Sequence, residues 1–213
     1  IVGGNHVSNA ISDYVHYKKN PSAIYRNSIR FLENDNIDFG MWGECDFALP
    51  DFIQKHSNKE EYTKSLGLAY FSDGKYHVNP KPISPPNLDE LPLETREIFN
   101  VEGYFELGYF HSSKGHKRVG NVLASRGCPE KCSFCTTPNL FGQQVRWRSP
   151  LKIYEEIRML KDKYKVTEIQ FDDDTLTANR KWLMDICALI QPLGLRWCTP
   201  NGVKVNYYSN NVE

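Results

Sequence analysis

The sequence has few cysteines, no excess charge of either sign and no long apolar run. Six cysteines among 213 residues are too sparse for a disulfide scaffold, so we expect a reduced, cytoplasmic setting. The 26 basic residues balance the 26 acidic ones, which argues against nucleic acid or an anionic membrane as a partner. No apolar stretch approaches the ~18 residues of a spanning helix. Because the chain opens on Ile1 without a signal-like segment, we expect a fragment of a longer protein.

Composition divides the chain into three parts. Residues 1–66 are a mixed stretch with a Gly-Gly pair near its start. Residues 67–117 begin with a predicted β-hairpin, in which Asp73-Gly74 suits a two-residue turn, and continue into a proline-rich linker. Residues 118–213 alternate between strand and helix patterns.

The third part predicts strands at 119–125, 166–171 and 195–200, with a helix starting at Ser149-Pro150 and a second helix before the last strand. This order is typical of βαβ units in a parallel sheet. A complete eight-unit barrel takes ~250 residues, so this part supplies about three units of a truncated barrel.

Three cysteines follow the first of these strands in the spacing C-x3-C-x2-C, at Cys128, Cys132 and Cys135. Three thiolates on one loop can hold three irons of a [4Fe–4S] cluster and leave the fourth iron open to another ligand. Gly127 frees the backbone where the strand ends, and Pro129 stiffens the turn.

A zinc-structural module or an iron–sulfur electron-transfer module is the alternative interpretation. Structural zinc usually takes four ligands from two CxxC-like pairs. Cys187 is expected on the buried face of a helix and Cys198 within a strand, so neither brings a second pair. Both modules stay open beside an enzyme.

The cysteine spacing, with Phe134 just before the last cysteine, resembles the motif of the radical S-adenosylmethionine (SAM) superfamily. The resemblance implies that the open iron of a [4Fe–4S] cluster binds SAM, which is cleaved to methionine and a 5′-deoxyadenosyl radical. It also implies a partial (βα)6 TIM-type barrel, a contact between SAM and Phe134, and a reductant such as flavodoxin or ferredoxin.

The second predicted strand ends in three aspartates. If Ile169 and Phe171 face the helices, alternation turns Gln170 and Asp172 toward the barrel interior, near the carboxyl end of the strand where ligands bind. The family often has a Gly-Gly-Glu segment here that binds the amino group of SAM. This chain has Phe-Asp-Asp-Asp, so the resemblance assigns Gln170 and Asp172 to SAM by position only.

Two further groups are expected to have plainer roles. The last two aspartates of that run, Asp173 and Asp174, are as consistent with the start of a loop or helix as with a ligand site. Arg146 and Arg148 are expected to form a solvated basic pair beside a packed Trp147, and a contact with a phosphate or a carboxylate is the alternative.

The first part resembles the end of the cobalamin-binding domain that precedes many radical SAM domains, a doubly wound, Rossmann-like fold. The family pattern V-G-G-P-H-x-S/T appears at residues 2–8 with asparagine in place of proline, and a G-E-G-E segment appears in part at residues 43–46. The L-D-x-L-P linker of the family appears at residues 88–92. The resemblance implies cobalamin-binding roles for Gly3, Gly4, Gly43 and Glu44.

The joined resemblances imply radical methylation. The deoxyadenosyl radical would remove hydrogen from an unactivated carbon of a small-molecule or peptide substrate, and methylcobalamin would supply the methyl group. Some members with this architecture instead perform ring formation or rearrangement, which the sequence leaves open. Methylthiolation is another alternative within the superfamily, although it prefers a second cysteine trio, which Cys45 alone does not provide.

Overall fold

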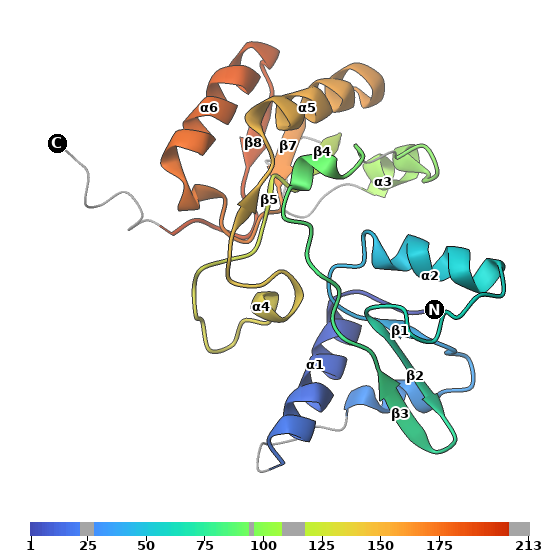
Figure 1. The fold of residues 1–213 in the computed structure, drawn as a ribbon. Helices are drawn as coiled ribbons and strands as arrows, with labels where there is room; N and C mark the ends of the chain where they lie inside the picture. Colours follow the sequence, from blue (N-terminus) through green and yellow to red (C-terminus); the bar gives the residue numbers. More distant parts are fainter. Residues whose placement is uncertain (22–27, 94–95, 108–117, 205–213) are drawn as a thin grey trace. The chain divides into compact units, whose positions relative to one another are not determined.

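The computed structural model describes residues 1–21, 28–93, 96–107 and 118–204 (Figure 1). The chain forms two compact units, the first made of residues 1–86 and 129–144 and the second of the remainder. No helix within the described ranges is both long and apolar enough to cross a membrane. The predicted hairpin, assigned above to the middle part, joins the sheet of the first unit.

The first unit contains a three-stranded antiparallel sheet in the order β1-β2-β3. Its strands are β1 (Gly40–Met41), β2 (Leu68–Ser72) and β3 (Lys75–Val78). The hairpin prediction is confirmed, because Asp73 and Gly74 form its two-residue turn with φ angles of 50° and 71°.

Helices cover both faces of this sheet, and strand alternation decides which side chains meet which helix. Met41 packs with Phe52 of α2 (Ala48–Ser57), whereas the next residue, Trp42, packs with Ile11 of α1 (Asn5–Lys19). The sequence predicted only a mixed stretch where α1 lies. Two short helices complete the described part of this unit: η1 (Ser28–Glu33) and α4 (Thr137–Leu140).

The second unit is built on a parallel sheet in the order β4-β7-β8, as the strand–helix alternation predicted. Its strands are β4 (Val119–Val122), β7 (Glu168–Phe171) and β8 (Arg196–Cys198). Helices α5 (Pro150–Tyr164) and α6 (Arg180–Ile190) lie side by side against the sheet (Figure 1). The smaller elements are η2 (Leu88–Glu90), α3 (Val101–Leu107), β5 (Ser125–Arg126), β6 (Arg146–Trp147), η3 (Leu176–Ala178) and η4 (Gln191–Leu193).

The core of the second unit joins these helices to one face of the sheet. Ile153 and Ile157 of α5 and Ile186 of α6 are fully buried against Ile169 and Phe171 of β7. Burial of a side chain of this size stabilises the fold by about 1.5–3 kcal/mol each. The predicted start of α5 is confirmed, since Ser149 is its N-cap and Pro150 its first residue.

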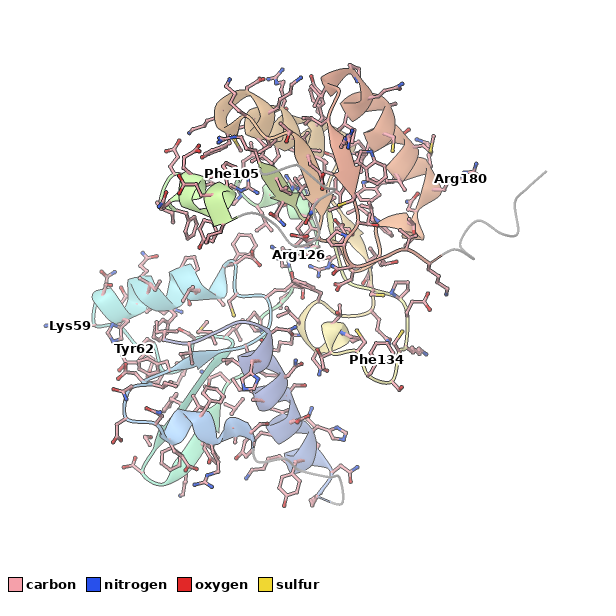
Figure 2. The ribbon with its side chains drawn as sticks, turned by 180° about the vertical axis from the view of Figure 1, so that it is seen from behind. Lys59, Tyr62, Phe105, Arg126, Phe134 and Arg180 are labelled. Carbon is pink, nitrogen blue, oxygen red and sulfur yellow. The ribbon has the colours of Figure 1, made fainter. Side chains whose placement is uncertain are left out.

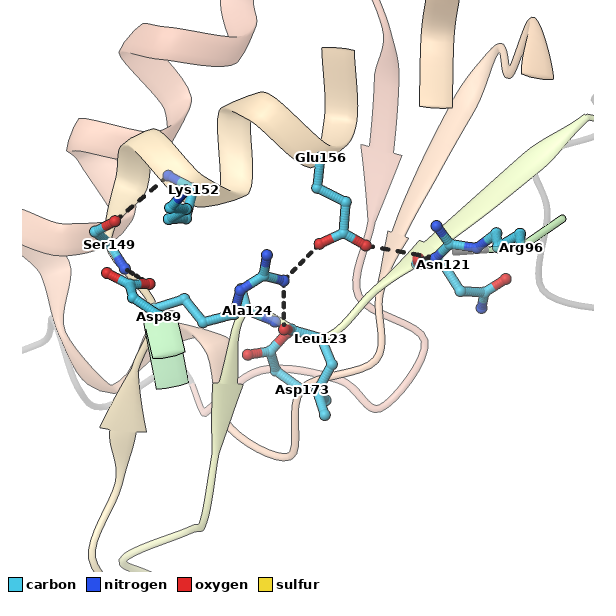
Figure 3. Close-up of polar contacts among 10 residues, drawn as sticks. Asp89, Arg96, Asn121, Leu123, Ala124, Ser149, Lys152, Glu156 and Asp173 are labelled. Atoms are coloured by element: carbon cyan, nitrogen blue, oxygen red, sulfur yellow. Dashed lines mark hydrogen bonds and ion pairs between the residues drawn. The ribbon is translucent and has the colours of Figure 1, made fainter. Parts of the chain in front are cut away.

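A buried ion pair network ties three distant segments of the second unit together (Figure 3). Glu156, on α5, has 1% of its surface exposed, and its carboxylate accepts from Arg148 Nη1 at 2.5 Å and from Arg96 Nη2 at 3.5 Å. The same guanidinium groups donate to the carbonyls of Leu123 and Asn121 in and just after β4. The expectation that Arg148 is solvated is therefore wrong, because its charge is compensated inside the unit.

Removing the shared carboxylate leaves two largely buried guanidinium groups without their acidic partner. We expect Glu156→Ala to lower the free energy of unfolding by about 3–5 kcal/mol. Asp185→Ala is the matched control, because it removes an exposed helical ion pair with Lys181 and is expected to cost at most about 0.5 kcal/mol. Urea unfolding followed by tryptophan fluorescence measures both, and equal losses in the two variants would contradict a structural role for the network.

Candidate functional site

The predicted cluster ligands are free thiols on the loop between β5 and β6. Cys128 is half-buried, and Cys132 and Cys135 are exposed. A backbone hydrogen bond of 3.0 Å from Cys135 N–H to the Cys132 carbonyl shapes the turn between the last two. Phe134, in the same turn, is 87% exposed (Figure 2). In the described part of the chain, no three His, Cys, Asp or Glu side chains are gathered as a metal site.

The remaining three cysteines are poorer candidates for thiolate ligands. Burial, with a smaller contribution from Asp46, raises the pKa of Cys45 to about 11. Burial also raises the pKa of Cys187 and of Cys198, the latter with a further contribution from the Glu168 carboxylate. Because the thiolate is the form that binds metals, the trio on the cysteine loop, two of whose thiols are exposed, is the donor set whose chemistry fits a [4Fe–4S] cluster.

Strands β5 and β6 close the base of the cysteine loop. They pair antiparallel, with Ser125 opposite Trp147 and Arg126 opposite Arg146. The backbone N–H of Arg148 then donates to the Ala124 carbonyl at 3.0 Å, which extends the pairing. Both ends of the loop are thus attached to the second unit.

Asp173, just beyond β7, binds Ala124 and Ser125, which lie at the base of the cysteine loop. Its carboxylate is 1% exposed and accepts hydrogen bonds from Ala124 N–H at 3.1 Å and from Ser125 Oγ at 2.5 Å. Burial raises the pKa of Asp173 to about 6, partly offset by these hydrogen bonds. No sequence pattern distinguished Asp173 from Asp174, because the partners of Asp173 lie 48 and 49 residues away.

The two predicted SAM residues of β7 lie on a polar face of the sheet. Ile169 and Phe171 pack in the core, so Gln170 and Asp172 lie on the opposite face, as alternation predicts. Gln170 is fully buried, and its Oε1 has no hydrogen-bond partner among the described residues. Asp172 accepts from Asn121 Nδ2 at 2.7 Å.

Two neighbouring residues on this polar face were not singled out by the sequence as site residues. Glu168 is buried, and its Oε1 accepts from Gln170 Nε2 at 3.5 Å. Cys198 of β8 places its Sγ 3.7 Å from the same carboxylate oxygen. Acid and amide groups therefore line this face of β7.

The structure brings the four predicted cobalamin residues together at one edge of the first sheet. Val2 bridges in parallel to Gly40, so Gly3-Gly4 and Gly43-Glu44 both follow the carboxyl ends of adjacent parallel segments. Ligands bind at such ends in open α/β sheets. Ser8, which the family pattern includes without a role, is buried, and its Oγ accepts from Gly43 N–H at 3.1 Å.

The glycines at this edge differ in the space around them. A Cβ on Gly43 would lie 2.8 Å from Lys81 Cγ, so close packing within the unit already requires this glycine. Gly4, in contrast, has a φ of +90° and no atom within 4 Å of an added Cβ. Glu44 is buried at 4% exposure. Gly4 therefore marks the open part of the edge.

Comparisons with known proteins find methyltransferases among the relatives of this chain. It is 29% identical over 192 residues to an uncharacterized methyltransferase of Pyrococcus horikoshii, covering 90% of this chain and 40% of the relative. It is 28% identical over 193 residues to the cytidylyl-2-hydroxyethylphosphonate methyltransferase of Streptomyces wedmorensis, covering 80% and 36%. The chain thus spans about two fifths of the length of these relatives. No model of a known protein family matches it.

Solved structures show the same fold. The cobalamin-dependent S-adenosylmethionine radical enzyme OxsB, with aqua-cobalamin and S-adenosylmethionine bound, matches 89% of this chain with a TM-score of 0.57 and 18% identity, over 24% of its own length. The radical S-adenosylmethionine methyltransferase TsrM of Kitasatospora setae matches 90% with a TM-score of 0.57 and 18% identity, over 32% of its length. The chain is thus similar in sequence to methyltransferases and in fold to cobalamin-dependent radical SAM enzymes, which agrees with the resemblance predicted from the sequence.

Proposed function

We propose that this chain is part of a cobalamin-dependent radical SAM methyltransferase. The observation that carries the proposal is the loop of three free thiols in C-x3-C-x2-C spacing, attached to the edge of a parallel α/β sheet. The sequence relatives that are methyltransferases support the reaction class. The second unit would then supply the first βα units of a partial (βα)6 barrel, and the first unit the end of a Rossmann-like cobalamin-binding domain.

In this proposal Cys128, Cys132 and Cys135 hold a [4Fe–4S] cluster through their thiolates. When bound, the cluster supplies the electron that cleaves SAM to methionine and a 5′-deoxyadenosyl radical. The exposed ring of Phe134 would cover the apolar part of the bound SAM and keep water from it. Asp172 and the unpartnered Oε1 of Gln170 offer acceptors for the SAM ammonium group.

The edge that contains Gly3, Gly4, Gly43 and Glu44 is the proposed cobalamin site. The open space at Gly4 allows backbone to approach a bulky ligand closely, and the hydrogen bond between Ser8 and Gly43 holds the two glycine segments together. The protein groups would position the cobalamin and the substrate, while the cofactors carry the radical chemistry and the methyl group.

The wider setting follows from the same proposal. A flavodoxin or ferredoxin would be the reductant, the cytoplasm the compartment, and a small molecule or a peptide the substrate. A zinc module, an electron carrier and a methylthiotransferase are the alternatives, and the following experiments distinguish the first two from the proposal.

The first prediction concerns the cysteines. After anaerobic reconstitution with iron and sulfide, the wild-type protein should contain one [4Fe–4S] cluster, and its EPR spectrum in the reduced state should change on addition of SAM. Single changes of Cys128, Cys132 or Cys135 to alanine should each abolish the cluster, because they remove one of its three protein ligands.

Cys187→Ala is the matched control for these variants. Cys187 is a free thiol like the trio, but burial raises its pKa, so its loss should leave the iron and sulfide content unchanged. Tight binding of zinc without iron uptake would indicate a structural zinc module and contradict the proposal. A cluster whose EPR spectrum does not respond to SAM would indicate an electron carrier.

The second prediction concerns cobalamin. Gly4→Val should weaken binding of hydroxocobalamin by about 10-fold or more, because the added side chain fills the open space beside the edge. Gly74→Val is the matched control, since Gly74 also has a positive φ and open space around it but lies in the hairpin turn. Absorbance titration measures both affinities. Equal affinities in the two variants would exclude the Gly4 edge as the cobalamin site.

A further inference from the structure

The backbone between β4 and β5 is held from two sides by residues distant in sequence (Figure 3). Arg148 donates from Nη1 to the Leu123 carbonyl at 3.2 Å and from its backbone N–H to the Ala124 carbonyl at 3.0 Å. Asp173 accepts from Ala124 N–H at 3.1 Å and from Ser125 Oγ at 2.5 Å. Ala124 is fully buried, and both of its backbone polar groups are therefore satisfied by these two residues.

This segment leads directly to the first cysteine. Cys128 follows Ser125 by three residues, which span at most about 11 Å even when fully extended. The pairing of β5 with β6 closes the loop at Ser125 and Trp147. Any displacement of Ser125 is therefore passed to Cys128 over a short length of chain.

The burial of Asp173 points to a specific use of its carboxylate. A carboxylate removed from water is costly unless it is hydrogen-bonded, and a buried group that loses its partner destabilises the fold. Both side-chain hydrogen bonds that the structure gives to Asp173 come from the segment before Cys128. Asp173 itself follows β7, where Asp172 N–H donates to the Val122 carbonyl at 2.9 Å, so it is fixed relative to β4.

We infer that Asp173 is a positioning residue for the cysteine loop: it fixes Ala124 and Ser125 so that Cys128 is presented for cluster binding. The inference rests on the proposed function, because the cluster is what the fixed loop would serve. Asp173 acts through the backbone and needs no contact with the cluster or SAM. Its conservative amide variant is therefore expected to retain the role.

The test compares Asp173→Ala with Asp173→Asn. Alanine removes both hydrogen bonds, whereas asparagine keeps them, since its Oδ1 can accept from Ala124 N–H and its Nδ2 can donate to Ser125 Oγ. After reconstitution, Asp173→Ala should hold its cluster about 10-fold more weakly, with an altered EPR spectrum, as is typical when a residue supporting metal ligands is lost. Asp173→Asn should retain the wild-type iron content and spectrum.

Hydrogen exchange of the metal-free protein gives a second readout. Asp173→Ala should accelerate exchange of the amides of residues 124–128 by about 10-fold, because the Ala124 N–H loses its acceptor. Ile186→Val is the control for general loss of stability: it trims the buried core of α6 and should leave both the EPR spectrum and exchange at 124–128 unchanged.

The outcomes separate this inference from the proposed function. Wild-type iron content, spectrum and exchange in Asp173→Ala would overturn the positioning role. If that variant does not fold, Ser125→Ala removes one of the two hydrogen bonds, and wild-type behaviour there would also overturn it. A wild-type protein that binds no cluster would overturn the proposed function, while exchange at 124–128 would still decide whether Asp173 fixes the base of the loop.

Discussion

The carboxylate of Glu156 lies in the interior of the second unit and compensates the charges of Arg148 and Arg96. Through these two guanidinium groups it also fixes the carbonyls of Leu123 and Asn121, and so the end of β4. A buried ion pair of this kind adds less to stability than its geometry suggests, because desolvation offsets much of the attraction. The ion pairs instead determine where the end of β4 lies. The strand that leads into the cysteine loop is held by the guanidinium groups of Arg148 and Arg96, which both bind the Glu156 carboxylate.

Local signals allowed much of the fold to be predicted. Ser149 and Pro150 marked the start of α5 because an N-cap and a proline act within one turn. Asp73-Gly74 marked the hairpin because few residues adopt positive φ without strain. The cysteine trio was recognisable for the same reason, since all three ligands lie within eight consecutive residues.

Other features depend on residues far apart and had no comparable signal. Arg148 binds the carbonyl of Leu123, 25 residues away, and Asp173 binds Ala124 and Ser125, 49 and 48 residues away. Helix α1 is a different case. Its residues Val7, Ala10 and Ile11 are buried, and their spacing is typical of one face of a helix. The sequence therefore contained a local signal for this helix, next to the Gly-Gly segment.

The central claim is that this chain belongs to a protein in which cobalamin and SAM act together to methylate a carbon. The most direct measurement uses the full-length protein with reductant, cobalamin and SAM labelled in its adenosyl group, followed by mass spectrometry of the SAM-derived products. The account predicts that 5′-deoxyadenosine and S-adenosylhomocysteine accumulate together, because one SAM yields the radical and another reloads the methyl group of cobalamin. Deoxyadenosine without cobalamin binding or S-adenosylhomocysteine would contradict it.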